Sequence, residues 1–200
     1  MGDYLAVLML FAIPTGILVI GTVFITLRKR WMINRAWAEA TARLGLTLTT
    51  EPYEEPSAVG EHGQRPAQLY QPVRLGWWRR TNYTRLTLTI RNRSQIRLKI
   101  TAPKPALSFL SDFSKSDAVH TGSDAVDGRF AIWGSPQPAA AKLMADTALQ
   151  ALLLTLPRWV EIEANYSSLS LNLRGEEQNV DLLVSAFTIL DDLANRIEGM

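Results

Sequence analysis

The stretch from Arg85 to Ile100, RLTLTIRNRSQIRLKI, decides the class of fold. Apolar residues alternate with polar ones on both sides of a polar turn, at Leu86, Leu88 and Ile90 before Asn92-Arg93-Ser94 and at Ile96, Leu98 and Ile100 after it. A period of two residues is typical of a strand with one buried and one exposed face. We therefore predict a β-hairpin here, with one aliphatic face and one basic face.

The rest of the chain beyond residue 30 repeats this strand pattern and adds helices. Strand patterns lie around 46–48, 129–133, 160–164 and 169–173, and helical patterns cover 35–44, 139–156 and 177–197. Residues 51–66, with three prolines and two glycines, predict a surface connection. Strands grouped in hairpins, with helices packed on one side, predict an α+β fold with an antiparallel sheet.

An uncharged and mostly apolar stretch, Tyr4 to Leu27, precedes this domain and is followed directly by Arg28-Lys29-Arg30. As a helix it would rise about 36 Å, enough to cross a hydrocarbon core of about 30 Å. A cleaved signal peptide is the alternative, but the first three residues contain an acid and no base, and the apolar stretch is too long. We predict a transmembrane anchor over residues 1–30 and one α+β domain over residues 31–200.

The charges on either side of the apolar stretch predict its orientation. Bases follow it, whereas only Asp3 precedes it. Because bases are enriched on the cytoplasmic side, we expect a single-pass protein of the cell membrane with its N-terminus outside and its domain in the cytoplasm. Trp31, next to the bases, fits the aromatic belt at the lipid headgroups. The chain contains no cysteine, which excludes disulfides and thiolate metal sites.

Positive and negative residues are segregated along the domain. Residues 62–111 contain ten Lys or Arg and no acid, whereas residues 112–200 contain thirteen acids and six bases. One interpretation is pairing within the sheet, of Arg97 and Lys99 with Glu161 and Glu163. The other is a basic surface turned toward anionic lipid.

The segment Leu75 to Arg80 bears on the second interpretation, because it places two indole rings beside two guanidinium groups. Such side chains are suited to a membrane interface. The candidates for membrane contact are therefore Trp31, Trp77, Trp78, Arg79 and Arg80. We do not expect a nucleic acid partner, since no binding motif accompanies the bases and the domain as a whole is not basic.

The best local motif follows His120, in the segment Thr121-Gly122-Ser123-Asp124-Ala125-Val126-Asp127. One hypothesis is a membrane-bound hydrolase in which His120, Asp124 and Asp127 bind a divalent ion or orient a base. The other is a turn, for which Asp and Gly are favoured by their backbone preferences. A single acid pair without further ligands favours the turn. Phosphate-binding, dinucleotide, serine-hydrolase and zinc motifs are missing from the sequence, so we expect no cofactor, no metal and no enzyme activity.

The order of these features resembles that of an uncharacterised family of bacterial membrane-anchored α+β domains. The resemblance rests on Leu44-Gly45-Leu46, on Gly60 with Arg65-Pro66, and on Thr121-Gly122-x-Asp124-x-x-Asp127-x-x-Phe130. It implies that the last motif anchors a turn to the sheet, and it implies no activity.

We therefore expect a membrane-tethered binding or scaffolding module whose partner is another protein or the lipid bilayer. Two alternatives remain. One is hydrolysis at His120, Asp124 and Asp127, and the other is recognition of anionic lipid through the Trp and Arg segment.

Overall fold

The computed structural model describes the backbone of residues 2–50, 55–75, 80–103 and 117–200, and the side chains of residues 18–50, 55–72, 82–103 and 117–200. The helices are α1 (Gly2–Leu44), α2 (Asp124–Asp127), α3 (Gln137–Met144), α4 (Thr147–Thr155) and α5 (Val180–Glu198). The strands are β1 (Leu46–Thr49), β2 (Ser57–His62), β3 (Arg65–Tyr70), β4 (Val73–Leu75), β5 (Arg80–Thr89), β6 (Arg97–Thr101), β7 (Ala131–Ser135), β8 (Glu161–Ala164) and β9 (Ser168–Arg174).

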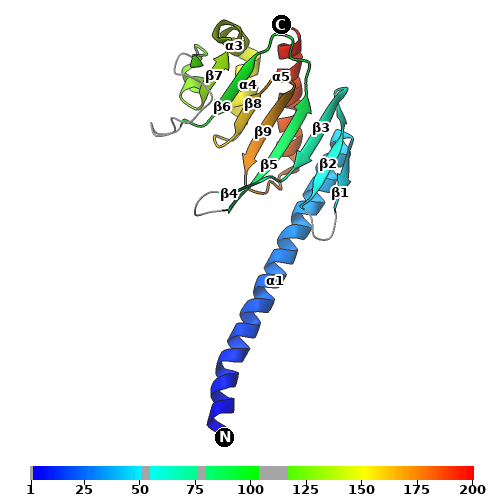
Figure 1. Ribbon diagram of the computed structural model, residues 1–200, viewed down its shortest axis with the longest axis vertical. Coiled ribbons are helices and arrows are strands. Elements are labelled where there is room, and N and C mark those ends of the chain that lie inside the picture. Colours follow the sequence, from blue (N-terminus) through cyan, green and yellow to red (C-terminus); the bar gives the residue numbers. More distant parts are fainter. Residues whose placement is uncertain (1, 51–54, 76–79, 104–116) are drawn as a thin grey trace.

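The described strands form one antiparallel sheet (Figure 1). Their order across the sheet is β1-β2-β3-β5-β9-β8-β6-β7, and β4 pairs with β5 beside that path. The predicted α+β fold with an antiparallel sheet is thereby confirmed. The connection predicted over residues 51–66 is wrong in its extent, because β2 lies within it and β3 begins at Arg65.

The hairpin predicted between Arg85 and Ile100 is also wrong, although both of its strands form. β5 pairs with β3 and β9, whereas β6 pairs with β7 and β8, so the β8–β9 hairpin lies between them. Asn92 accounts for the difference, because its side-chain amide donates to the carbonyl oxygens of Ile96 (2.6 Å) and Asn165 (2.9 Å). Asn165 lies in the β8–β9 turn, so the connection is fastened to that turn instead of closing a hairpin.

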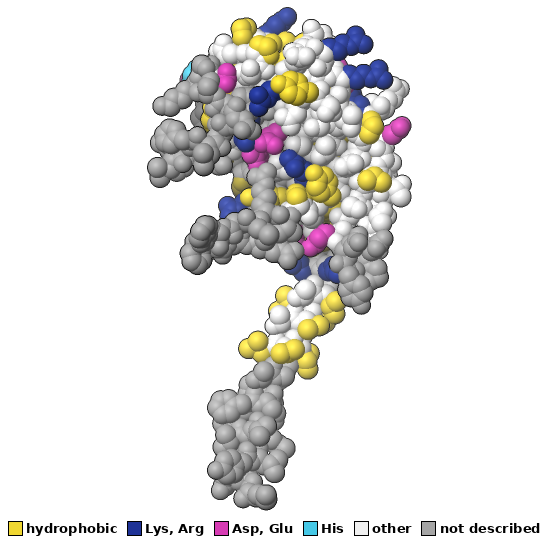
Figure 2. Space-filling view, in the orientation of Figure 1, with side chains coloured by type: hydrophobic (Ala, Val, Ile, Leu, Met, Phe, Trp, Pro, Cys, Tyr) yellow, Lys and Arg dark blue, Asp and Glu magenta, His cyan; other side chains and the backbone are white. Residues whose placement is uncertain are grey.

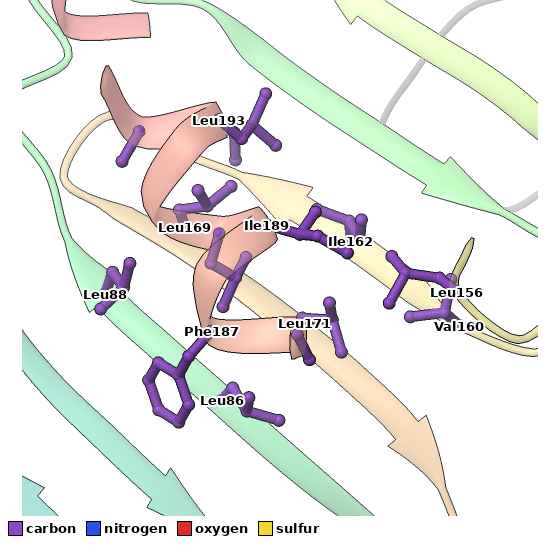
Figure 3. Packing of buried hydrophobic residues seen from close by; sticks show 14 of the residues in the cluster. Leu86, Leu88, Leu156, Val160, Ile162, Leu169, Leu171, Phe187, Ile189 and Leu193 are labelled. Carbon is purple, nitrogen blue, oxygen red and sulfur yellow. The ribbon is translucent and has the colours of Figure 1, made fainter. Parts of the chain in front are cut away.

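One face of the sheet is aliphatic and packs against α5. A single cross-strand row shows this face, formed in register by Leu69, Leu86, Leu171, Ile162, Ile100 and Ile132. All six side chains are buried. From α5, Phe187, Ile189 and Leu193 lie against the strands (Figure 3). Removal of this apolar surface from water is the main favourable contribution to folding.

The helix predicted over residues 139–156 is in fact two helices, α3 and α4. Asp146 separates them because its carboxylate accepts hydrogen bonds from the backbone N–H groups of Ala148 (2.8 Å) and Leu149 (3.1 Å). This is the N-cap arrangement that begins a helix. α3 packs closely on β7, where a Cβ atom at Gly134 would overlap the side chain of Ala140.

α1 is longer than the sequence predicted, since it continues through the bases at 28–30 and ends at Leu44. Its last turns are part of the core, with Trp37 and Ala40 fully buried. The indole N–H of Trp37 donates to the carbonyl oxygen of Glu177 (3.1 Å). Gly45 follows with a φ of +72°, as expected for a glycine just after a helix.

The transmembrane anchor predicted over residues 1–30 is wrong. Among the residues that the structure describes, no helix has the length and apolar character needed to cross a membrane. α1 also continues without a break through the charged residues at 28–30 and into the core of the domain. The localisation derived from the anchor, with one span, an outer N-terminus and a cytoplasmic domain, is wrong for the same reason.

Candidate functional site

Residues 18–32 of α1, here called the projecting segment, extend away from the sheet (Figure 1). Large apolar side chains between 44% and 70% exposed lie along this segment, at Leu18, Val19, Ile20, Val23, Phe24, Ile25, Leu27, Trp31 and Met32. Figure 2 shows hydrophobic side chains on both edges of this part of the helix. Consecutive residues of a helix point in different directions, so these side chains do not form one stripe. A helix that is apolar on all sides is typically buried, either within protein or in a membrane.

Trp31, which the sequence placed at a membrane, lies at the end of the projecting segment. Its side chain is exposed, and the guanidinium carbon of Arg35 lies 5.5 Å from the centre of its ring. Trp77, Trp78 and Arg79 lie outside the described residues, and only the backbone of Arg80 is described. Their contact with lipid stays a prediction.

A cavity of about 350 Å³, here called the junction cavity, lies where α1 meets the sheet. Lys29 and Arg30 line it from α1, and Glu55 and Glu176 line it from the domain. The ammonium nitrogen of Lys29 lies 2.9 Å from a carboxylate oxygen of Glu176. Ile25 lines the cavity too, so the projecting segment and the junction cavity are adjacent.

Two side-chain amides in the wall of the junction cavity have a buried atom without a hydrogen-bond partner among the described residues. These atoms are the amide nitrogen of Gln71, a residue that is 7% exposed, and the amide oxygen of Asn34. Buried polar atoms are nearly always paired, and an unpaired one costs about 1–3 kcal/mol. Both atoms are inaccessible to solvent, so they lie beneath the accessible wall of the cavity and do not face its interior.

Sequence reasoning missed the junction cavity because its residues come from distant parts of the chain. Asn34 lies on α1, Gln71 follows β3, and Glu176 follows β9. One signal was present in the sequence. Asn34 is polar, although it lies on the packed part of α1 between the buried residues Ile33 and Trp37.

The sheet face opposite α5 carries charged side chains of both signs, which Figure 2 shows next to one another. Lys99 lies opposite Glu163 in the register, and its ammonium nitrogen is 2.8 Å from Glu163 and 3.3 Å from Glu161. The predicted pairing of Lys99 is thereby confirmed, whereas Arg97 lies opposite Ser135 of β7. Burial acts to lower the pKa of Lys99, but the hydrogen bonds and negative charges of both glutamates outweigh it and raise that pKa.

The motif around His120 forms a turn that Asp127 holds together. The carboxylate of Asp127 accepts hydrogen bonds from the backbone N–H of Thr121 (3.0 and 3.2 Å) and from its hydroxyl (2.9 Å). Gly122 has a φ of +77°, a conformation that glycine adopts most readily. The carbonyl oxygen of Thr121 accepts from the buried amide of Gln150 (3.1 Å), which connects the turn to α4. The motif therefore has a structural role, in which it holds the turn and joins it to α4.

The side chains of the hydrolase hypothesis do not form a catalytic group. His120 is 90% exposed in its side chain, and its Nδ1 atom lies 3.9 Å from Asp127. Asp124 is exposed in the first turn of α2, and the carboxylate of Asp127 is engaged in the turn. Within the described part of the chain, no three His, Asp or Glu side chains lie together as a metal site would require.

Comparison with known proteins gives one solved structure of similar fold. It is the crystal structure of the mycobacterial trehalose monomycolate transport factor A, TtfA, with a TM-score of 0.55 and 9% sequence identity over 83% of this chain and 94% of that chain. No protein-family model and no curated protein matches the sequence. Membership of the family of bacterial membrane-anchored domains stays a prediction. At 9% identity, the likeness to TtfA shows a common fold.

Proposed function

We propose that the protein is a binding and scaffolding module that holds a partner protein through the projecting segment. The observation that carries the proposal is the exposure of nine large apolar side chains along residues 18–32 of a helix whose C-terminal turns are built into the core. Extended apolar surface on a folded protein marks a site of interaction. The packed end of α1 fixes the direction in which the projecting segment leaves the domain.

The proposed partner presents an apolar groove, or a group of helices, with an acidic residue at its rim. The apolar side chains require a surface that encloses the helix, and Arg28 follows Leu27 directly. A carboxylate at the edge of the groove would then meet Arg28. A second copy of the chain fits less well, because parallel association would bring the basic clusters of both copies together.

Binding agrees better with the observed contacts than catalysis does. The carboxylate of Asp127, 3.9 Å from the Nδ1 atom of His120, is engaged in the turn by three hydrogen bonds. The protein of similar fold is named as a transport factor, and a binding role for this chain is in keeping with that name.

Site-specific photo-crosslinking of the full chain in cells tests the proposal. A photoreactive residue placed at Phe24, which is 64% exposed on the projecting segment, is expected to give one discrete protein adduct. The same residue placed at Thr188, exposed on α5, is the control and is expected to give no such adduct. Adducts with lipid alone, or equal adducts at both positions, would contradict the proposal.

A further inference from the structure

We propose that a groove beside the projecting segment, here called the Trp31 groove, receives a large apolar side chain of the partner protein, next to a carboxylate that pairs with Arg35. The inference rests on the proposed function and deepens it, because it names the chemistry of the partner segment that lies against the domain. The groove has a volume of about 290 Å³. α1 contributes Trp31 and Arg35 to its wall, and the segment that begins α5 contributes Gln178 and Val180.

The apolar part of the wall continues the surface of the projecting segment. Trp31 is 61% exposed and Met32 is 44% exposed, and both line the groove. Arg28, Trp31, Met32 and Arg35 follow one another at a spacing of three, four and seven residues, so they lie on one face of the continuous helix α1. A partner that encloses the projecting segment and meets Arg28 therefore reaches the groove along the same face. Large apolar side chains around a hollow favour an apolar anchor residue as its occupant.

Arg35 provides a positive charge at the edge of this apolar wall. Its guanidinium carbon lies 5.5 Å from the centre of the Trp31 ring, within the range of a cation–π contact. Its side chain is exposed, and no acid forms an ion pair with it in the parts of the chain that the structure describes. A carboxylate of the partner can therefore reach this guanidinium group without displacing an internal ion pair.

The acid that lines the groove, Glu39, is already paired. Its carboxylate lies 2.6 Å from the guanidinium group of Arg43, which also lies 3.0 Å from Asp181. The charge of Glu39 is thereby offset, whereas that of Arg35 is not. Complementary charge across an interface favours the correct partner, so the groove favours an acidic group beside the apolar anchor over a neutral or basic one.

Two capped dipeptides that differ in one charge test the inference on the purified full chain. They are acetyl-Phe-Glu-amide and acetyl-Phe-Gln-amide, and the readout is the indole N–H resonance of Trp31, assigned with Trp31→Phe. Both dipeptides are expected to shift it, with dissociation constants in the millimolar range that is usual for such small ligands. The acidic dipeptide is expected to bind about threefold more tightly, as for an exposed ion pair, and less so in high salt.

Variants separate the contribution of Arg35 from that of any exposed base. Arg35→Met is expected to bind both dipeptides equally, because it keeps an apolar side chain and removes the charge. Arg158→Met is the matched control, since Arg158 is also exposed and lies next to an exposed tryptophan, Trp159. It is expected to keep the preference for the acidic dipeptide. Each variant is first shown to retain the backbone spectrum of the parent chain.

Four results would overturn the inference. They are no shift of the Trp31 resonance at roughly 20 mM of either dipeptide, an equal shift of the Trp159 resonance, equal binding of the two dipeptides, and a preference that persists in Arg35→Met. Tighter binding of sodium octanoate than of the acidic dipeptide would assign the groove to lipid and would overturn it too. The crosslinking expected at Phe24 is measured separately in cells, so failure here is distinguishable from failure of the proposed partner binding.

Discussion

Two adjoining parts of α1, residues 18–32 and residues 33–44, have similar apolar character and opposite environments. Residues 33–44, the packed end, bury Ile33, Trp37, Ala40 and Leu44 in the core. The projecting segment, residues 18–32, exposes side chains that are at least as apolar. The helix is continuous between them. Hydrophobicity alone therefore does not decide burial in this chain, because burial also needs an opposing surface such as the one that α5 and β1 offer to the packed end.

Two tryptophans six residues apart give the sharpest test of this comparison. Trp37→Ala is expected to lower the free energy of unfolding by about 3–5 kcal/mol, since it removes a fully buried ring and its hydrogen bond to Glu177. Trp31→Ala removes an exposed ring and is expected to change it by less than about 0.5 kcal/mol. Denaturant unfolding of the full chain measures both changes in the free energy of unfolding. Equal changes would mean that residues 18–32 and residues 33–44 do not differ in burial.

The second prediction concerns the ion pairs between β3 and α5, the helix on which the packed end of α1 lies. Arg65 of β3 lies 2.6 Å from Asp191 and 2.7 Å from Glu198, both on α5, and its side chain is mostly buried. Arg65→Met leaves these two carboxylates without their common base. We expect a loss of about 2 kcal/mol, between the values for buried and for surface ion pairs.

The control for Arg65 is Arg43→Met. Arg43 also pairs with an acid of α5, Asp181 at 3.0 Å, but it is half exposed, so a change below about 0.5 kcal/mol is expected. A loss at Arg43 as large as that at Arg65 would contradict the account. Denaturant unfolding at two salt concentrations measures both variants.

The third prediction is the pH dependence of the contact between β3 and α5. The hydrogen bond from Arg65, opposed by burial and assisted by the backbone N–H of Arg91, holds the pKa of Glu198 below its usual 4.5. A lowered pKa in the folded protein means that the stabilisation is present above pH 4.5 and is lost as the pH falls below that value. Glu198→Gln should therefore cost about 1 kcal/mol at pH 7. The difference from the parent chain should shrink as the pH falls below 4.5, and thermal unfolding across pH 3–7 would show a constant difference if this is wrong.

The last prediction concerns the open sheet face, away from α1, where an effect of similar size is expected. Lys99→Met leaves Glu161 and Glu163 close together without their common base, and we expect a loss of about 1 kcal/mol that decreases in high salt. Lys142→Met, at an exposed position of α3, is the control and is expected to have no measurable effect. Equal values for the two variants would show that the network adds nothing to stability.

Local periodicity predicted the strands and their faces but not how the strands pair. Leu86, Leu88, Leu98 and Ile100 all face the core as expected. Alternation indicates which face of a strand is buried but contains no information about which strand lies beside it. The insertion of β8 and β9 between β5 and β6 could therefore not be predicted from it. The decisive contact, from Asn92 to Asn165, joins residues far apart in the sequence.

The same limit applies to the helices and to the candidate site. An apolar pattern over residues 139–156 did not reveal the break, because Asp146 also fits the polar stripe of one continuous helix. The junction cavity joins Asn34, Gln71 and Glu176, which only the tertiary fold brings together. The turn around Asp127 could be predicted from the sequence, since Asp and Gly at such spacing favour backbone hydrogen bonds.

The central claim is that a partner protein covers the projecting segment, and single cysteines test it most directly because the chain has none of its own. Phe24→Cys and the control Thr188→Cys are treated with a maleimide, once in the purified full chain and once in intact cell extracts. We predict that Cys at position 24 reacts rapidly in the purified chain and at least tenfold more slowly in the extract, whereas Cys at position 188 reacts equally in both. Equal reactivity at position 24 in both preparations, or protection restored by protein-free lipid vesicles alone, would contradict the account.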